Sequence, residues 1–303
     1  MAQTEFQSAK EWFLRDLNCN NKAEGTIKAY MADLNNLEVF LKQRFPGLLN
    51  KLSDLKASHV IQYREYLNTQ RGYSRRTVDR KYYCFRKFAK FLKMTGFVEK
   101  NVTLDVEHTK YKSGVNSNYL TWDEVFQIID MASMFGGANR TRDVALVSML
   151  AFTGCRRSEA LGLNWSDIDF ASDSITLYRP KTKVTDKIKM TPAMSDALRR
   201  YYLECRSQAI GPVFVSHRGT RISVTNFKQL FSKYVRYSGL KKGFAITPHT
   251  LRHSFITNLV IAKTSLTSIQ RYSGHKDLES LQVYIHLSFD GQNEVLDNIP
   301  HTA

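Results

Sequence analysis

The segment Ile246–Thr257, ITPHTLRHSFIT, contains the clearest signal for a helix in the chain. Thr247 followed by Pro248 predicts where that helix begins, because threonine is a good N-cap residue and proline fits the first helical position. One stripe of the helix is apolar and is expected to face a core: Leu251, Phe255 and Leu259. Much of the chain shows the same helical spacing of apolar residues, so helices are expected to dominate the fold.

His249 and Arg252 lie three residues apart in the first turn of this predicted helix, so their side chains share one side of it. The free N–H groups and the dipole at a helix N-terminus attract anions, and a histidine and an arginine add to that attraction. The pair therefore indicates a site for an anion such as phosphate. The alternative is a surface histidine beside a solvated arginine.

A second cationic segment lies upstream, where a strongly apolar helix predicted over residues 142–152 leads into Thr153–Phe170, TGCRRSEALGLNWSDIDF. Gly154 permits a tight turn, Arg156 follows it closely, and Glu159 is spaced to hold the guanidinium of Arg156. The alternative is that this arginine only interacts with the dipole of the preceding helix.

Residues 174–179 alternate in polarity and predict a strand, and residues 187–190 predict the strand that returns beside it. The loop between them is expected to cover residues 180–186 and to contain Lys181 and Lys183. With helices elsewhere, the expected fold class is mainly α with a small β-hairpin or sheet, which gives an α+β catalytic domain.

The segment Tyr272–Ser288, YSGHKDLESLQVYIHLS, contains Gly274, His275 and Tyr284. Glycine followed by histidine fits a helix C-cap. A tyrosine between two β-branched residues fits a buried core position. Considered singly, each of these residues is explained by a structural role.

The first third of the chain predicts four or five helices in about 100 residues, which is the pattern of a small helical bundle. Ser53, Ser58 and Ser74 are candidate N-caps, and a helix is expected to open at Thr26. Residues 108–118 are polar without an apolar period and are interpreted as a linker. The expected domains are therefore residues 1–107 and 119–303, the second opening with a capping box at Thr121.

The chain of 303 residues has 44 Lys and Arg against 28 Asp and Glu, a formal net charge of +16. Such self-repulsion favours a polyanionic partner. No run of 18 uncharged apolar residues predicts a membrane span, and no signal-peptide pattern opens the sequence. The four cysteines stand far apart, which favours reduced thiols over disulfides or zinc and indicates a cytoplasmic protein.

Positive charge concentrates between residues 71 and 100, which contain ten basic and two acidic residues interleaved with aromatic ones. The phenylalanines fit the core of the bundle, whereas the one-signed arginine and lysine face favours contacts to nucleic-acid phosphates over simple solvation. The candidate DNA-binding residues are Arg75, Arg76, Arg80 and Lys81, with Lys183 added from the hairpin.

Taken in chain order, the motifs are far more specific than any one of them. Arg156, a hairpin lysine, the His249-x-x-Arg252 pair, His275 and, nine positions later, Tyr284 resemble the tyrosine recombinase, or phage integrase, family. The three quoted segments resemble the three signature segments of that family. Residues 1–107 resemble its helical core-binding (SAM-like) domain and residues 119–303 its catalytic domain. The chain resembles the simpler Xer-like or transposon-type members, in which two domains clamp DNA.

The resemblance implies a role for each residue. Arg156 and Arg252 would clamp the scissile phosphate. Tyr284 would be the nucleophile, forming a 3′-phosphotyrosyl intermediate. His249 would assist proton transfer, and His275 would hydrogen-bond the phosphate. The cationic surroundings are expected to favour the phenolate of Tyr284.

Two further residues follow from the resemblance, and two are set aside. Lys181 is preferred over Lys183 as the acid that protonates the leaving 5′-oxygen, because the family's lysine usually follows the first hairpin strand. Glu159 would orient Arg156. His253 matches no catalytic position of the family and is interpreted as a structural contact.

The resemblance also implies partners. The substrate would be a double-stranded DNA recombination site, exchanged through a Holliday junction by a homotetramer on two DNA sites. The acidic tail after Tyr284, with its few apolar residues, is a candidate helix for docking on a neighbouring protomer. No cofactor, metal or membrane is expected, accessory proteins are compatible with the pattern, and the place of action would be the nucleoid in the cytoplasm.

Two other functions fit parts of the same pattern. A type IB topoisomerase uses a similar set of residues as a monomer, without a second DNA site. A DNA-binding regulator with an inactive recombinase fold would lack the nucleophile or a clamping arginine, and the sequence contains all of them.

Overall fold

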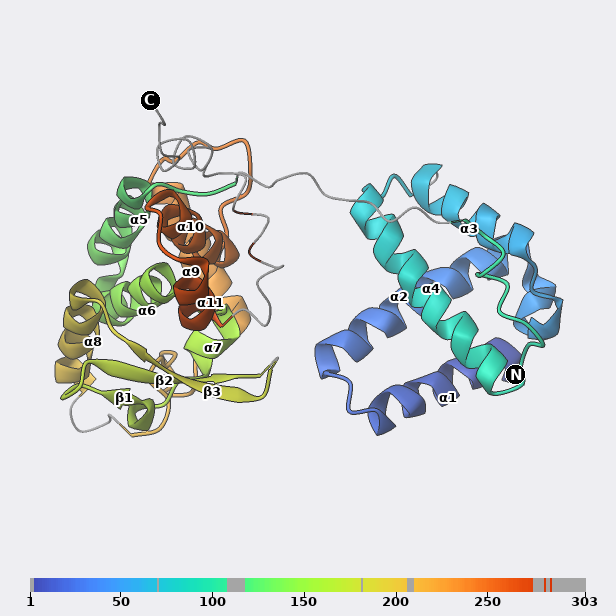
Figure 1. Cartoon of the computed structure of the whole chain (residues 1–303), viewed down its shortest axis with the longest axis horizontal. Helices are drawn as coiled ribbons and strands as arrows, with labels where there is room; N and C mark the ends of the chain where they lie inside the picture. Colours follow the sequence, from blue (N-terminus) through green and yellow to red (C-terminus); the bar gives the residue numbers. More distant parts are fainter. Residues whose placement is uncertain are drawn as a thin grey trace, which may run out of the picture. The chain divides into compact units, whose positions relative to one another are not determined.

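The computed structural model describes residues 3–69, 71–107, 118–180, 182–205, 210–274, 281 and 284. The chain divides into two compact units, Met1–Gly114 and Val115–Ala303, which are coloured blue to cyan and green to red in Figure 1. The division falls inside the segment 108–118 that the sequence predicts as a linker, residues 108–117 of which lie outside the described residues. Each unit is described by itself below.

The described part of the first unit is helical. Its α-helices are α1 (Glu5–Cys19), α2 (Glu24–Arg44), α3 (Ala57–Thr69) and α4 (Arg75–Met94), with short 3-10 turns η1 (Pro46–Leu49) and η2 (Leu52–Asp54) between α2 and α3. Aromatic side chains fill the space between α1 and α4, where the ring centroids of Phe13 and Phe88 lie 5.4 Å apart. This aromatic core confirms the bundle that the sequence predicts.

The sequence predicts some of the helix starts in this unit correctly and others not. Ser74 caps α4 as predicted, since its hydroxyl accepts the amide of Thr77. Ser58 does not cap α3, because that helix already begins at Ala57. The imidazole Nδ1 of His59 accepts the amide of Lys56 there instead, at 3.0 Å. α2 begins at Glu24, earlier than the expected Thr26.

The second unit adds a small sheet to a helical body. Its helices are α5 (Trp122–Phe135), α6 (Arg140–Thr153), α7 (Arg157–Gly162), α8 (Pro192–Cys205), α9 (Val224–Tyr237), α10 (Pro248–Ile261) and α11 (Leu266–Ser273), with 3-10 turns η3 (Gly137–Asn139) and η4 (Trp165–Asp167). Its strands are β1 (Ile168–Asp169), β2 (Ser174–Arg179) and β3 (Val184–Lys189). This mainly α architecture with one small sheet confirms the expected fold class.

The sheet is antiparallel, in the order β1-β2-β3, and lies along one edge of the unit beside α7 (Figure 1). β2 pairs with β3 along its whole length, from Ser174 opposite Lys189 to Arg179 opposite Val184. The predicted loop over residues 180–186 is therefore wrong, because β3 starts at Val184. The ladder continues through polar residues that the expected pattern of apolar alternation excluded.

α6 forms the centre of the unit and is buried on nearly all sides, as its apolar sequence predicts. Gly154 ends it in the left-handed region, with φ at +58°, which glycine adopts without strain. A side chain at this position would also collide with the ring of Phe255 on α10, only 2.5 Å from an ideal Cβ. The glycine therefore lets α6 and α10 approach closely at the point where Arg156 follows.

Within the described ranges, no helix is long and apolar enough to span a membrane.

Candidate active site

Arg156 and Glu159 lie at the start of α7, immediately after the turn at Gly154. Glu159 accepts the backbone amide of Arg156 at 2.8 Å and, through its other oxygen, the guanidinium Nη1 of Arg156 at 2.8 Å. The Glu159 side chain is fully buried, whereas that of Arg156 remains 25 % exposed. One end of the Arg156 guanidinium is thus held by the protein while the side chain still reaches the surface.

Arg252 lies on α10, and its buried side chain points toward the turn at Gly154. Its Nη1 donates to the carbonyl oxygen of Gly154 at 2.5 Å and to that of Ser273 at 2.9 Å. Burial and the nearby charge of Arg156 lower the pKa of Arg252 to about 10, which still leaves it charged at neutral pH. The two arginines of the predicted phosphate clamp therefore lie within electrostatic reach of each other.

His249 is the second residue of the same helix, which has the predicted Thr247 at its N-cap and Pro248 at its first position, and Thr250 completes a capping box with Thr247. Loss of solvation lowers the pKa of His249, and the positive charges of Arg252, Arg156 and Arg157 lower it further. An anion bound among these cations would reverse that effect and stabilise the protonated imidazole.

Arg157 belongs to this cationic group, although no sequence motif singles it out. Its Nε is buried and has no hydrogen-bond partner among the described residues. A phosphate oxygen would satisfy such a buried donor.

Tyr284 lies against α10 and α11, in a small apolar cluster with residues that include Phe255 and Ile269. Its ring is 6 % exposed, and its hydroxyl is hydrogen-bonded to Nδ1 of His253. The structural role that the sequence assigned to His253 is thus contact with the predicted nucleophile itself. The ring of His253 also packs edge-on against that of His249, with centroids 4.6 Å apart.

The expectation that the surroundings favour the phenolate is wrong for the DNA-free protein. Burial raises the pKa of Tyr284 to about 12, and the charge of Arg252 opposes this increase only in part. Burial and the neighbouring His249 and Arg252 lower the pKa of His253 to about 4, so that its imidazole is neutral. The nucleophile therefore rests as a protonated phenol beside a neutral histidine.

Two predicted catalytic residues, Lys181 and His275, lie outside the described residues. Their neighbours are placed: Lys183 is exposed at the end of the hairpin turn, with φ at +58°, and Gly274 caps α11 with φ at +66°. The prediction that Gly274 ends a helix directly before His275 is confirmed.

Arg179 is a second residue that the sequence analysis missed. It ends β2, and its side chain is 1 % exposed. Its Nη1 donates to Glu159 at 2.7 Å and its Nε to Asp186 at 2.9 Å. Buried arginine at the end of an alternating strand has no signal in the sequence, because its partners come from distant segments.

The candidate DNA-binding residues of α4 fall into two groups. Arg75 and Arg76 are exposed, as is Arg80, which also pairs with the buried Asp33. Lys81 is a correction: its side chain is 8 % exposed and its ammonium lies 3.1 Å from Asp33. The charge of Lys81 is neutralised inside the bundle, so it does not belong to the basic surface.

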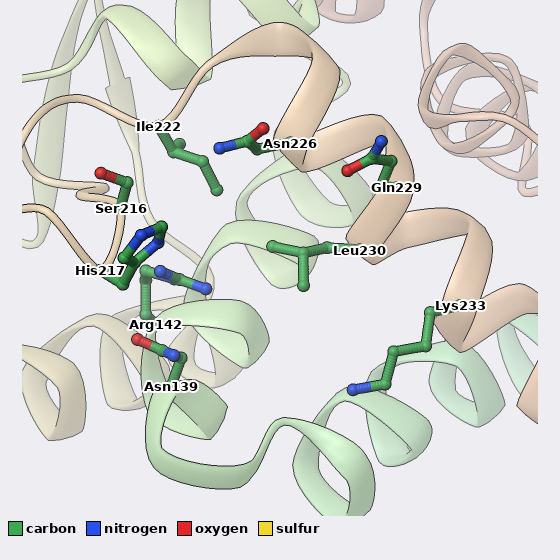
Figure 2. Close-up of a pocket in the computed structure, with 9 residues that line it drawn as sticks. All are labelled: Asn139, Arg142, Ser216, His217, Ile222, Asn226, Gln229, Leu230 and Lys233. Carbon is green, nitrogen blue, oxygen red and sulfur yellow. The ribbon is translucent and has the colours of Figure 1, made fainter.

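One open pocket is lined by none of these candidate residues. A cavity of about 460 Å³ lies between the start of α6, the segment before α9, and α9 itself, and none of the proposed catalytic side chains lines it (Figure 2). Its lining residue Arg142 is held by Asp143 and by the carbonyl oxygen of Val215, at 2.8 and 2.7 Å. The role of Arg142 is therefore structural.

Comparison with known proteins identifies the class. Residues 118–290 match the model of the phage integrase family, and residues 11–96 match that of the phage integrase N-terminal SAM-like domain. The protein is thus a tyrosine recombinase, an enzyme that cleaves and rejoins DNA through a phosphotyrosine intermediate. Within that class, the chain belongs to the phage integrase family and has the two-domain architecture of its Xer-like members.

Curated relatives match nearly the whole chain. Tyrosine recombinase XerC of Syntrophus aciditrophicus is 31 % identical over 293 residues, which cover 91 % of this chain and 92 % of that protein. Tyrosine recombinase XerC of Roseiflexus sp. is 28 % identical over 289 residues, covering 92 % and 88 %. These relatives support site-specific recombination and give no support to a topoisomerase or an inactive regulator.

Solved structures share the fold. The XerH site-specific recombinase bound to difH substrate in a pre-cleavage complex has a TM-score of 0.73 at 18 % identity, over 98 % of this chain and 90 % of that one. The Tn1549 transposon integrase in complex with a circular intermediate DNA also has a TM-score of 0.73 at 18 % identity, over 98 % and 100 %.

Proposed function

We propose that this recombinase attacks a DNA phosphodiester with Tyr284, and that Arg156, Arg252, His249, His275 and Lys181 supply the remaining chemistry. The observation that carries the proposal is the convergence of α7, α10 and α11 on one turn, with Arg252 bonded to the carbonyl oxygens of Gly154 and Ser273. Those oxygens belong to the segments that lead directly to Arg156 and to His275.

In the proposed reaction the hydroxyl oxygen of Tyr284 forms a bond to the scissile phosphorus, and the bond from phosphorus to the 5′-oxygen breaks. The proton of the phenol passes to His249 or to solvent, and Lys181 donates a proton to the leaving 5′-oxygen. Arg156 and Arg252 stabilise the charge on the non-bridging oxygens. One phosphodiester replaces another, so the exchange uses neither a nucleotide nor a metal ion.

Because burial raises the pKa of Tyr284, activation of the nucleophile depends on the binding of DNA. A phosphate near Arg252 and Arg156 offsets the charges that lower the pKa of His249, which makes that imidazole a better acceptor for the proton of the phenol. We therefore infer that Tyr284 becomes reactive when the substrate binds, which limits attack on other electrophiles by the DNA-free enzyme.

The proposal extends to assembly. The named relatives are site-specific recombinases of the Xer type, and strand exchange between two sites requires two cleaved duplexes. We propose a homotetramer on two double-stranded DNA sites, a Holliday-junction intermediate, action on nucleoid DNA in the cytoplasm, and optional accessory proteins. The acidic tail after Tyr284, outside the described residues, is the segment proposed to dock on a neighbouring protomer.

Replacing the nucleophile tests the function directly. Tyr284→Phe removes only the hydroxyl, so the variant is expected to bind its DNA with unchanged affinity and to form no covalent adduct. A nicked suicide substrate run on a denaturing gel measures the adduct. Tyr272→Phe is the matched control, because Tyr272 on α11 donates its hydroxyl to the backbone of Lys189 and takes no part in the proposed reaction. An adduct on Tyr284→Phe would show that another residue attacks.

A further inference from the structure

Arg179 joins three of the segments that carry the proposed catalytic residues. It ends β2, two residues before Lys181, and its guanidinium is buried against α7 and the end of α11. No motif in the sequence assigns it a role, and its side chain does not reach the protein surface.

Each nitrogen of the Arg179 guanidinium is used. Nε donates to Asp186 on β3 at 2.9 Å, and Nη1 donates to Glu159 at 2.7 Å. Nη2 donates to the carbonyl oxygen of Tyr272 at 3.0 Å, and Nη1 also reaches that of Ser273 at 3.3 Å. One side chain thus fixes the hairpin, the carboxylate that holds Arg156, and the last turn of α11.

The contact with α11 extends to Gly274, the residue before His275. An ideal Cβ on Gly274 would lie 2.5 Å from Cζ and 2.6 Å from Nε of Arg179, so the guanidinium lies flat against the glycine backbone. The glycine is required twice here, once for its positive φ of 66° and once for the space that Arg179 occupies.

The backbone of Arg179 also closes the hairpin turn. Its carbonyl oxygen accepts the amides of Thr182 at 3.1 Å and Lys183 at 2.8 Å. These bonds anchor the two residues that follow Lys181 in the sequence. The side chain and the backbone of one residue therefore set both where the turn closes and how it sits against α11.

Arg252 shares one of these acceptors. The carbonyl oxygen of Ser273 accepts from Arg252 at 2.9 Å and from Arg179 at 3.3 Å. A shift of Arg179 therefore changes the surroundings of both clamping arginines: Arg252 through Ser273, and Arg156 through Glu159. Arginine suits this position better than lysine, because its planar fork can serve several acceptors at fixed angles.

We propose that Arg179 is a positioning residue of the recombinase, and that it holds Lys181, Arg156 and His275 in register for cleavage. The inference rests on the proposed roles of those residues. Its effect is on the chemical step, because displacement of catalytic groups by about 1 Å can cost about 100-fold in rate.

The test compares Arg179→Lys, which keeps the charge and loses the fork, with wild type. Single-turnover cleavage is measured on a normal phosphodiester and on a 5′-bridging phosphorothiolate, whose leaving thiolate needs no protonation. We expect a loss of about 100-fold on the normal substrate, unchanged DNA affinity, and a sulfur-to-oxygen rate ratio that rises at least several-fold toward that of Lys181→Ala. A role confined to folding would lower both rates equally and leave this ratio at the wild-type value.

Asp186→Asn is the second variant, since it removes the negative charge of one partner of Arg179 and leaves the buried arginine in place. It should raise the same ratio. Arg199→Lys is the matched control, because Arg199 pairs with Asp173 at the other end of the hairpin. Wild-type rate ratios in both Arg179→Lys and Asp186→Asn would overturn the inference. Adduct formation by wild type and its loss in Tyr284→Phe test the proposed function separately.

Discussion

His253 is bonded to the hydroxyl of Tyr284, yet it is a poor acceptor for the phenol's proton. The pKa of Tyr284 is raised to about 12 by burial, and that of His253 is lowered to about 4, first by burial and then by its charged neighbours. Full proton transfer from the phenol to this imidazole is therefore unfavourable. The contact orients the ring, while burial keeps the hydroxyl protonated in the DNA-free protein.

This argument predicts a mild effect for His253→Gln, which retains hydrogen-bonding capacity and cannot titrate. Single-turnover cleavage should fall by less than about tenfold, below the 10²–10⁴-fold that a general base contributes. His249→Gln is the comparison, and its loss should lie within that larger range. A greater defect in His253→Gln than in His249→Gln would reassign the base to His253.

The hairpin lysines are distinguished by the leaving group. Lys181→Ala should cleave a normal phosphodiester about 10²–10⁴-fold more slowly and be largely rescued by a 5′-bridging phosphorothiolate, as expected for loss of a general acid. Lys183→Ala should be nearly normal on both substrates, because Lys183 is exposed beyond the turn. Sulfur rescue of Lys183→Ala would exchange the two assignments. If neither variant is rescued, His249 becomes the next candidate for the acid.

At the scale of the element, α4 presents arginines on one face and hides one lysine within the bundle. Arg76→Glu should weaken binding to many DNA sequences and reduce the slope of log affinity against log salt by about one unit per lost phosphate contact. Lys81→Met should leave that slope unchanged and lower the melting temperature, because it leaves Asp33 with Arg80 alone. Binding titrations at several salt concentrations measure the first effect, and thermal denaturation measures the second. A reduced slope for Lys81→Met would return Lys81 to the DNA surface.

The elements themselves were largely predictable because their signals are local. Thr121 and Ser74 cap helices, Gly154 and Gly274 end them, and residues 174–179 form a strand. The start of β3 was not predictable, since its exposed residues carry no apolar alternation and pairing with β2 decides where it begins. The buried positions of Lys81 and Arg179 were not predictable for a related reason. Their partners, Asp33 and the end of α11, lie far away in the sequence.

At the scale of the molecule, the histidines near Tyr284 tie the stability of the fold to pH. His253 has a pKa of about 4 in the folded protein against 6.5 for the free side chain. Between these values the unfolded chain binds a proton that the folded chain does not, so protonation favours unfolding. The free energy of unfolding should therefore fall as pH drops from about 6.5 toward 4, with no contribution from His253 above that window.

Denaturant titrations across this pH range measure the dependence. His253→Gln should flatten it, while His217→Gln, a substitution at an exposed histidine, should preserve the wild-type slope. A slope in His253→Gln equal to that of wild type would show that His253 does not carry the dependence.

The two buried thiols provide each unit with its own chemical label. Cys84 lies inside the first unit and Cys155 beside Arg156 in the second, each 1 % exposed. Burial raises the pKa of Cys84 to about 12 and that of Cys155 to about 11, so an alkylating reagent reacts with either only during transient opening. Mass spectrometry after timed alkylation can therefore follow the opening of each unit separately in the wild-type protein, without added cysteines. The same measurement with DNA bound can report which unit the DNA protects.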